Sequence, residues 1–282
     1  MKYALLLGAL ALLLFLPSCS ASLPDFDPLG TETEAVESET ADTPPIPTLT
    51  LSGRRFSFEG EAEAIDARDD LLCLKREGVY RLTGDLSEGG ISVDVGAFGR
   101  VRLILDGVSI RSTRRPAIEI VSAAAVILET EEGSVNLLWS SSEAVILGSD
   151  NLLLTGSGSL SLGGALRAIQ AEGRVSVASG TVRLSASECG IRSSVGVTLA
   201  GGEVAINAAR VGLCSEERSD SGGIEILGGD LVAVCSETVL SAKRRICLAG
   251  GRGSFDAPRW YLCGGEVLYT GGEFPMATDP RP

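Results

Sequence analysis

Histidine is absent from the 282-residue sequence, and aromatic residues make up only 5% of it. Because no imidazole is available, catalytic triads that use histidine and metal sites that depend on histidine ligands are excluded. No stretch combines a 3.6-residue apolar period with helix caps, so the sequence predicts no convincing helix. The expected secondary structure is therefore built from β-strands.

Long apolar runs are also scarce, and the clearest is the run from Tyr3 to Leu16. It is too short to span a bilayer comfortably but has the length of a signal-peptide core. The following LPSC at 16–19 places Leu, Ser and Cys as in the lipobox of bacterial lipoproteins. We therefore expect residues 1–19 to be a lipoprotein signal whose Cys19 carries the lipid, so that the protein is exported and lipid-anchored at the bacterial cell envelope or surface. The alternative is a secretory peptide in which this cysteine is incidental.

Lysine and arginine are missing from residues 20–50, which hold seven acidic residues together with several prolines and threonines. Such a segment cannot bury enough apolar surface to offset its chain entropy, so it is predicted to be a disordered tether. The formal net charge of the whole chain is −13, and residues 51–282 still hold more acidic than basic side chains. Because phosphate binding needs a basic face, nucleic acid is not expected as a partner.

Six cysteines follow Cys19 at irregular spacings, without a CxxC pair. An even number in an exported protein permits disulfides. However, free cysteine is among the residues most often found buried. The sequence favours buried thiols and does not assign a bridge.

An interval of 22 residues recurs in the second half of the chain. GRVSVASGTVRLSASECGIRS (173–193) aligns with VGVTLAGGEVAINAARVGLCS (195–215), and each row reads as a short alternating strand, a glycine corner, a second strand and a brief third one. Three strands per interval indicate coils stacked on one another, with Val177, Leu199 and Ile226 in one inward column. Residues 51–282 are therefore predicted to form a single parallel β-helix, since an antiparallel sandwich would not give an in-register interval of 22.

The phrases GVYRLTGDLSEGGISVDV (78–95), VRLILDGVSI (101–110) and NLLLTGSGSLSL (151–162) carry a family resemblance. Over residues 70–245 the chain resembles exported carbohydrate-binding domain proteins. The resemblance implies a right-handed β-helix similar to that of pectate lyases. It also implies cellulose or pectin-type polysaccharides as ligands, and bound calcium.

The calcium implied by this resemblance lacks its usual ligands. In members of this family each coil typically carries Asp-Gly-Ile at its third corner. The Asp carboxylates of successive coils then stack and suit a hard cation such as calcium. The matching positions here are Arg167, Cys189, Val211 and Thr238. We therefore expect no cofactor and no calcium at this column. The weak remaining candidates for a metal site are Glu188, Glu216 and Asp220, whose alternative interpretation is a solvated acidic insertion.

Catalytic groups are equally sparse. A lyase of this fold would need carboxylate-bound calcium and a base, and the basic residues Arg111, Arg114 and Arg115 lack such a calcium column. A glycosidase needs two carboxyl groups facing one groove, and only Asp94 and Asp106 are candidates for neighbours. The sequence therefore predicts that the protein is not an enzyme.

Sugar rings stack on aromatic faces, and the candidate carbohydrate-binding residues are Trp139, Trp260, Tyr261 and Tyr269. Those near the C-terminus have a second interpretation, as the cap that closes a solenoid. Together these observations predict a monomeric, noncatalytic polysaccharide-binding lipoprotein. A neutral glucan is expected to bind better than pectin because the chain is acidic. The alternatives are a structural or adhesive envelope protein without a sugar site, and a degenerate polysaccharide lyase.

Overall fold

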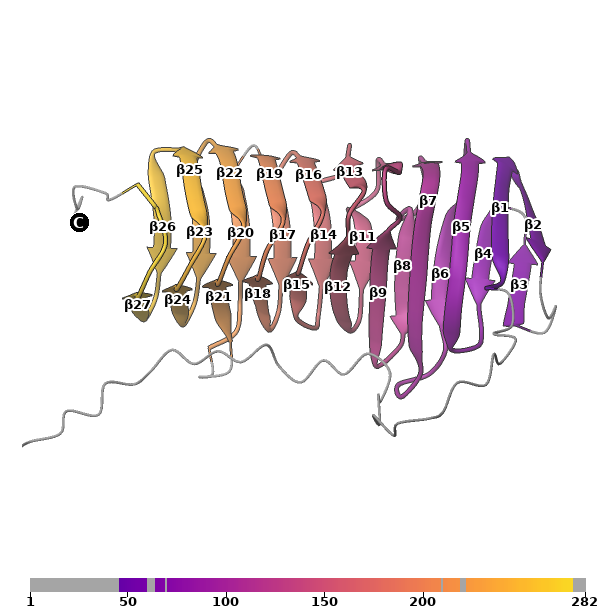
Figure 1. Cartoon of the computed structure of the whole chain (residues 1–282), viewed down its shortest axis with the longest axis horizontal. Helices are drawn as coiled ribbons and strands as arrows, with labels where there is room; N and C mark the ends of the chain where they lie inside the picture. Colours follow the sequence, from indigo (N-terminus) through magenta and orange to yellow (C-terminus); the bar gives the residue numbers. More distant parts are fainter. Residues whose placement is uncertain (1–45, 60–63, 69, 209, 219–221, 276–282) are drawn as a thin grey trace, which may run out of the picture.

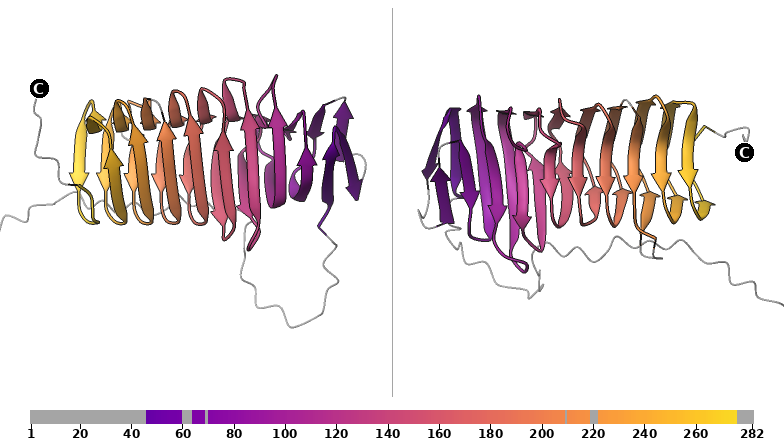
Figure 2. Two further views of the ribbon diagram at one scale, coloured as in Figure 1. Left: turned by 90° about the horizontal axis from the view of Figure 1, so that it is seen from above. Right: turned by 180° about the vertical axis from the view of Figure 1, so that it is seen from behind.

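The computed structural model describes residues 46–59, 64–68, 70–208, 210–218 and 222–275. Within them the chain is a parallel β-helix whose coils stack along one long axis from the N-terminal to the C-terminal strands (Figures 1 and 2). No helix in these ranges is long and apolar enough to cross a membrane. The predicted signal segment with Cys19, most of the predicted tether, and Asp220 lie outside the described residues.

Each regular coil contributes one strand to each of three faces. Face one holds the short strands β9 (Ala125–Thr130), β12 (Asn151–Gly156), β15 (Val175–Val177), β18 (Gly196–Leu199), β21 (Gly223–Ile226), β24 (Arg245–Leu248) and β27 (Glu266–Tyr269). Face two holds β10 (Val135–Ser140), β13 (Ser159–Gly163), β16 (Thr181–Ala186), β19 (Glu203–Ala208), β22 (Asp230–Cys235) and β25 (Arg252–Asp256). Face three holds β6 (Gly90–Asp94), β8 (Ile118–Ser122), β11 (Ala144–Gly148), β14 (Arg167–Ala171), β17 (Cys189–Ser193), β20 (Val211–Ser215), β23 (Thr238–Ala242) and β26 (Arg259–Cys263).

The first coils are irregular. The long strands β5 (Gly78–Leu86) and β7 (Arg100–Ser112) pair with each other, and β7 pairs with both β9 and β10, so it runs through faces one and two. The N-terminal end is closed by antiparallel pairs, β1 (Thr48–Gly53) with β2 (Arg55–Glu59) and β3 (Ile65–Arg68) with β4 (Leu71–Leu74). Strand β1 begins three residues before the predicted boundary at 51, because Leu49 already points into the core and is buried.

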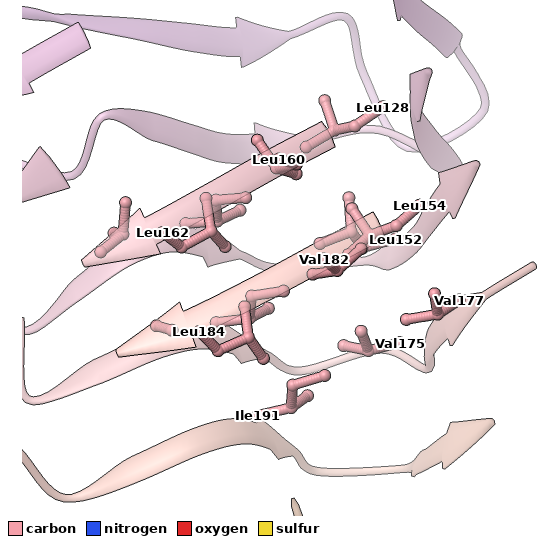
Figure 3. Packing of buried hydrophobic residues seen from close by; sticks show 14 of the residues in the cluster. Leu128, Leu152, Leu154, Leu160, Leu162, Val175, Val177, Val182, Leu184 and Ile191 are labelled. Atoms are coloured by element: carbon pink, nitrogen blue, oxygen red, sulfur yellow. The ribbon is translucent and has the colours of Figure 1, made fainter. Parts of the chain in front are cut away.

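The register confirms the predicted stacking of coils. Val177 pairs with Leu199 and Leu199 with Ile226, and all three side chains are at most 2% exposed. Leucines and valines of successive coils form similar inward columns, such as Leu160 beside Val182 (Figure 3). Because the coil repeats, equivalent apolar side chains always meet, and one continuous core fills the solenoid.

Glycine corners keep the coils close together. Gly202 has a φ of +77°, and a methyl group at this position would lie 2.6 Å from the carbonyl oxygen of Gly180 in the previous coil. Only glycine tolerates both the left-handed backbone and this approach. The five cysteines Cys73, Cys189, Cys214, Cys235 and Cys263 are free thiols, two of them buried.

Candidate functional site

The outer surface of face two presents two parallel rows of side chains. Along each strand of this face alternate residues point inward and outward, and the parallel pairing is in register from β7 to β22. Outward residues of successive coils therefore line up across the strands. One row is Ser109, Leu137, Ser161, Arg183, Ala205 and Val232; the other is Arg111, Trp139, Gly163, Ser185, Asn207 and Val234.

Both rows line a groove of about 740 Å³. The groove crosses six strands, which at ~4.8 Å per strand makes it roughly 24 Å long. None of its lining residues is acidic, although the chain as a whole carries an excess of acidic residues. Its shape suits an extended ligand, and its charge differs in sign from that of the rest of the molecule.

Trp139 is held in a fixed place in this groove. The guanidinium carbon of Arg111, on the preceding strand, lies 4.6 Å from the centroid of its ring. On the following coil the ring packs against Gly164, where a methyl group would lie 2.3 Å from the indole Nε1. The paired residue Gly163 also has no side chain, so the indole occupies space that any larger residue would fill. The ring is half-buried and keeps part of its surface open to the groove.

Apolar side chains are exposed towards both ends of the groove, on β10 and on β22. Leu137, Val232 and Val234 line the groove and are each about half exposed, and Val135 at the start of β10 is more exposed still. Sequence reasoning did not single out these residues, because each looks like an ordinary strand residue until its outward direction is known.

The remaining lining side chains are polar and uncharged or basic. Ser161, Ser185 and Asn207 offer hydroxyl and amide groups, and Arg183 stands exposed in the middle of the groove. The nearest acidic positions on this face are Glu203 at the start of β19, Asp256 on β25, which pairs with Val234, and Asp85 on β5, which pairs with Ser109. All three lie outside the groove lining.

The predicted aromatic residues near the C-terminus lie elsewhere. Trp260 and Tyr261 are on β26 of face three, with ring centroids 4.3 Å apart, and both pack partly buried against the core. Trp260 also stacks on Phe255 at 6.4 Å, and Tyr269 meets Phe274 at 6.3 Å. These rings form a C-terminal aromatic cluster that covers the last coil. The structure does not bring Trp139 together with them.

The residues at the third corner, Arg167, Cys189, Val211 and Thr238, pair with one another in turn from coil to coil, as the sequence predicts. The charged group in this column is the guanidinium of Arg167. Arg167 on β14 pairs with Cys189 on β17 in the parallel sheet. The Arg167 guanidinium forms ion pairs with Glu143 at 2.6 Å and with Glu188 at 2.8 Å. The other candidate, Glu216, is bound by Arg192 at 2.8 Å. Burial raises the pKa of the Cys189 thiol, which therefore stays protonated at neutral pH. No group of three or more possible ligands occurs in the part of the chain that the structure describes.

The suggested neighbouring carboxylates Asp94 and Asp106 are not neighbours. Asp94 ends β6 on face three and pairs with Lys75 at 2.6 Å, whereas Asp106 lies on β7 and pairs with Arg81 at 2.9 Å. This hypothesis was wrong because β7 belongs to faces one and two, so it cannot present its side chains beside those of β6. The carboxylate pair of a glycosidase is not formed by these two residues.

The basic residues around 111–115 also separate. Arg111 covers Trp139, while Arg114 and Arg115 both bind the buried carboxylate of Asp70, at 2.5 and 2.9 Å. Two guanidinium groups on one buried carboxylate neutralise it and fix the corner before β8. The two latter arginines are therefore structural.

Comparison with known proteins agrees with this architecture. Residues 49–258 match the family model described as carbohydrate-binding domain-containing protein. A curated protein of that description from Acetivibrio thermocellus is 29% identical over 126 residues, which are 38% of this chain and 44% of the relative. The aligned part of the chain thus spans less than half the length of that relative.

A solved structure shares the fold. A gadolinium derivative of the polysaccharide lyase-like protein from C. thermocellum superposes with a TM-score of 0.77 at 20% identity, covering 81% of this chain and 100% of that one. Since the family model spans most of the solenoid, the chain belongs to the family of carbohydrate-binding domain-containing proteins.

Proposed function

We propose that the protein binds a polysaccharide without cleaving it, in the groove of face two. The observation that carries this proposal is Trp139, an indole that has Arg111 over one face and Gly164 against its Nε1 edge and that lines an elongated groove. Aromatic faces are the usual platforms for sugar rings, and polar side chains beside them bind the hydroxyl groups. Face two offers both kinds of group in one continuous row.

The strand spacing supports a polymeric ligand. Successive strands are ~4.8 Å apart, close to the length of one sugar residue in an extended β-linked glycan. A chain lying across the strands would place successive sugars over Trp139, Ser161, Ser185 and Asn207 in turn, with Val232 and Val234 at the far end. Each contact is weak, and many of them together give useful affinity.

The lining residues also favour binding over catalysis. Glycoside hydrolysis needs two facing carboxyl groups, and a calcium-dependent lyase needs oxygen ligands for the cation. The lining of the groove contains neither aspartate nor glutamate. The polysaccharide lyase-like name of the solved relative makes a degenerate lyase the second candidate, and the absence of carboxylates from the lining speaks against it.

The cellular setting is a further part of the proposal. The LPSC segment at 16–19 supports lipid attachment at Cys19, and the acidic stretch 20–50 supports a tether that holds the monomeric β-helix away from the membrane. The protein would then display the groove at the cell surface. A neutral glucan has the ring faces and hydroxyl groups that the lining can contact, so it is the first ligand to test.

The test compares two aromatic-to-alanine variants in a pull-down on insoluble glucan. Trp139→Ala should lose most of the binding, whereas Phe98→Ala, which removes a 94% exposed ring outside the groove, should bind as the parent does. If Trp139→Ala binds as well as the parent, the groove is not the site. If the parent binds no polysaccharide, the structural or adhesive alternative is favoured.

A further inference from the structure

Asn207 is an asparagine whose side chain has no structural task, unlike the other two of the chain. The carboxamide of Asn136 is buried and hydrogen-bonded through both its oxygen and its nitrogen, and that of Asn151 accepts a hydrogen bond from the backbone of the next coil. The side chain of Asn207 is exposed in the groove and forms no hydrogen bond with any residue that the structure describes. A carboxamide carries one acceptor oxygen and two N–H donors, so all of these groups are open to a ligand.

Apolar side chains surround this carboxamide at the end of the groove that lies farther from Trp139. On β22 the paired neighbour of Asn207 is Val234, and the paired neighbour of Ala205 is Val232. Both valines point outward and are about half exposed. Strands of this kind lie ~4.8 Å apart, and residues of one face follow at ~6.6 Å along a strand. The four side chains therefore outline a small patch, the Asn207 patch, with one carboxamide and three apolar groups.

We infer, on the basis of the function proposed for this groove, that the Asn207 patch recognises an acetamido group. The groove would then bind polysaccharides built from N-acetylated amino sugars. The N–H and the carbonyl oxygen of such a group match the acceptor and the donors of the Asn207 side chain. Its methyl group is removed from water against Val232 and Val234. A hydroxyl group in the same place can reach the carboxamide but brings no methyl group to the valines.

The charges beside the patch also favour an uncharged substituent. Arg183 on β16 pairs with Ala205 on one side of the patch, and Asp256 on β25 pairs with Val234 on the other side. Both side chains are exposed and carry opposite charges. Their effects on an ionised substituent oppose each other and are screened by salt. Hydrogen bonding and apolar contact with a neutral amide are not weakened in this way.

The distance between Trp139 and the patch sets the length of ligand that can use both. Four strand spacings separate β10 from β22, which makes roughly 19 Å. Because one sugar residue covers about one strand spacing, a glycan of about five residues reaches from the indole to the valines. A hexasaccharide is therefore long enough to engage the tryptophan and the Asn207 patch together.

The experiment compares two hexasaccharides that differ only in the substituent at C2: β-1,4-linked glucose, with a hydroxyl group, and β-1,4-linked N-acetylglucosamine, with an acetamido group. Their affinities for the full chain are measured by titration calorimetry. One net hydrogen bond contributes ~1 kcal/mol, so the N-acetylated ligand should bind about fivefold tighter. Both ligands are uncharged, so the ratio of the two affinities should not change with salt.

Three variants locate the effect. Asn207→Asp keeps the shape of the side chain and removes its N–H donors, and Val234→Ser removes the apolar contact; each should bring the ratio of affinities close to one. The control is Val121→Ser, which changes an equally exposed valine on face three and should keep the ratio of the parent.

Equal binding of both ligands by the parent, tighter binding of the glucose ligand, or an unchanged ratio in Asn207→Asp and Val234→Ser would overturn this inference and leave polysaccharide binding intact. Failure of the parent to bind either hexasaccharide or any insoluble glucan would overturn the proposed function, and this inference with it.

Discussion

The guanidinium of Arg111 lies over the indole of Trp139, with its central carbon 4.6 Å from the ring centroid. A cation over tryptophan is the most favourable arrangement of this kind. Because Gly164 packs against the Nε1 edge of the indole, the ring has little freedom left to lose when a ligand stacks on it. The pair therefore acts as a prepositioned platform.

Substitution of Gly164 by alanine should displace this platform. The new methyl group would lie 2.3 Å from the indole Nε1, and the φ of +99° is itself unfavourable for alanine, so we expect a loss of about 1–2 kcal/mol in stability. Affinity for the glycan should fall by as much as in Trp139→Ala. Titration calorimetry and thermal unfolding measure the two effects.

The control for this variant is Gly133→Ala. Gly133 has a φ of +70° with open space around its Cα, so alanine introduces the same kind of backbone strain without touching a ring. Its affinity should equal that of the parent. Equal losses of affinity in Gly133→Ala and Gly164→Ala would mean that the packing of Trp139 against Gly164 does not determine glycan binding.

A charge in the inward column should unfold the solenoid. Val177 is 0% exposed, and Val177→Asp would bury an unpaired carboxylate at a cost of several kcal/mol. The same substitution at the half-exposed Val121 should change stability little. Similar melting temperatures for the two variants would contradict the assigned register.

Calcium should not stabilise the folded chain. A ligand that binds only the folded state at a hundredfold excess over its Kd adds ~2.7 kcal/mol, but the third-corner column is occupied by Arg167, which neutralises Glu143 and Glu188. We expect the melting temperature to stay constant in millimolar calcium. A rise that a chelator reverses would show that a calcium site exists.

Acid should weaken the pair between Asp230 and Arg252. The hydrogen bond from Arg252 lowers the pKa of the Asp230 carboxyl below its ordinary value of 3.8. The stabilising contribution is therefore fully present above pH 3.8 and is lost as the pH falls through the lowered pKa. NMR titration of the Asp230 carboxyl should show this low pKa in the parent and a higher one in Arg252→Gln; an unchanged value would rule out the pair in solution.

The period of 22 residues predicts the fold well, because stacked coils require the same inward residue at each return, as at Val177, Leu199 and Ile226. The groove could not be located in the same way. Trp139 and Trp260 are both aromatic residues in strands, and the sequence does not tell which one faces solvent. The position of Trp139 depends on Gly164 in the next coil, and the space around Arg183 depends on its small paired neighbours Ser161 and Ala205. Both are contacts between coils rather than local patterns.

The two tryptophans of the chain allow a direct test of where the ligand binds. Trp260→Phe leaves Trp139 as the single tryptophan, and Trp139→Phe leaves Trp260. The fluorescence emission of each variant is followed during titration with a soluble β-1,4-glucan oligosaccharide. We expect a saturable change in emission from Trp139 and none from Trp260. A change confined to Trp260 would place the ligand at the C-terminal aromatic cluster and contradict the assignment of the groove.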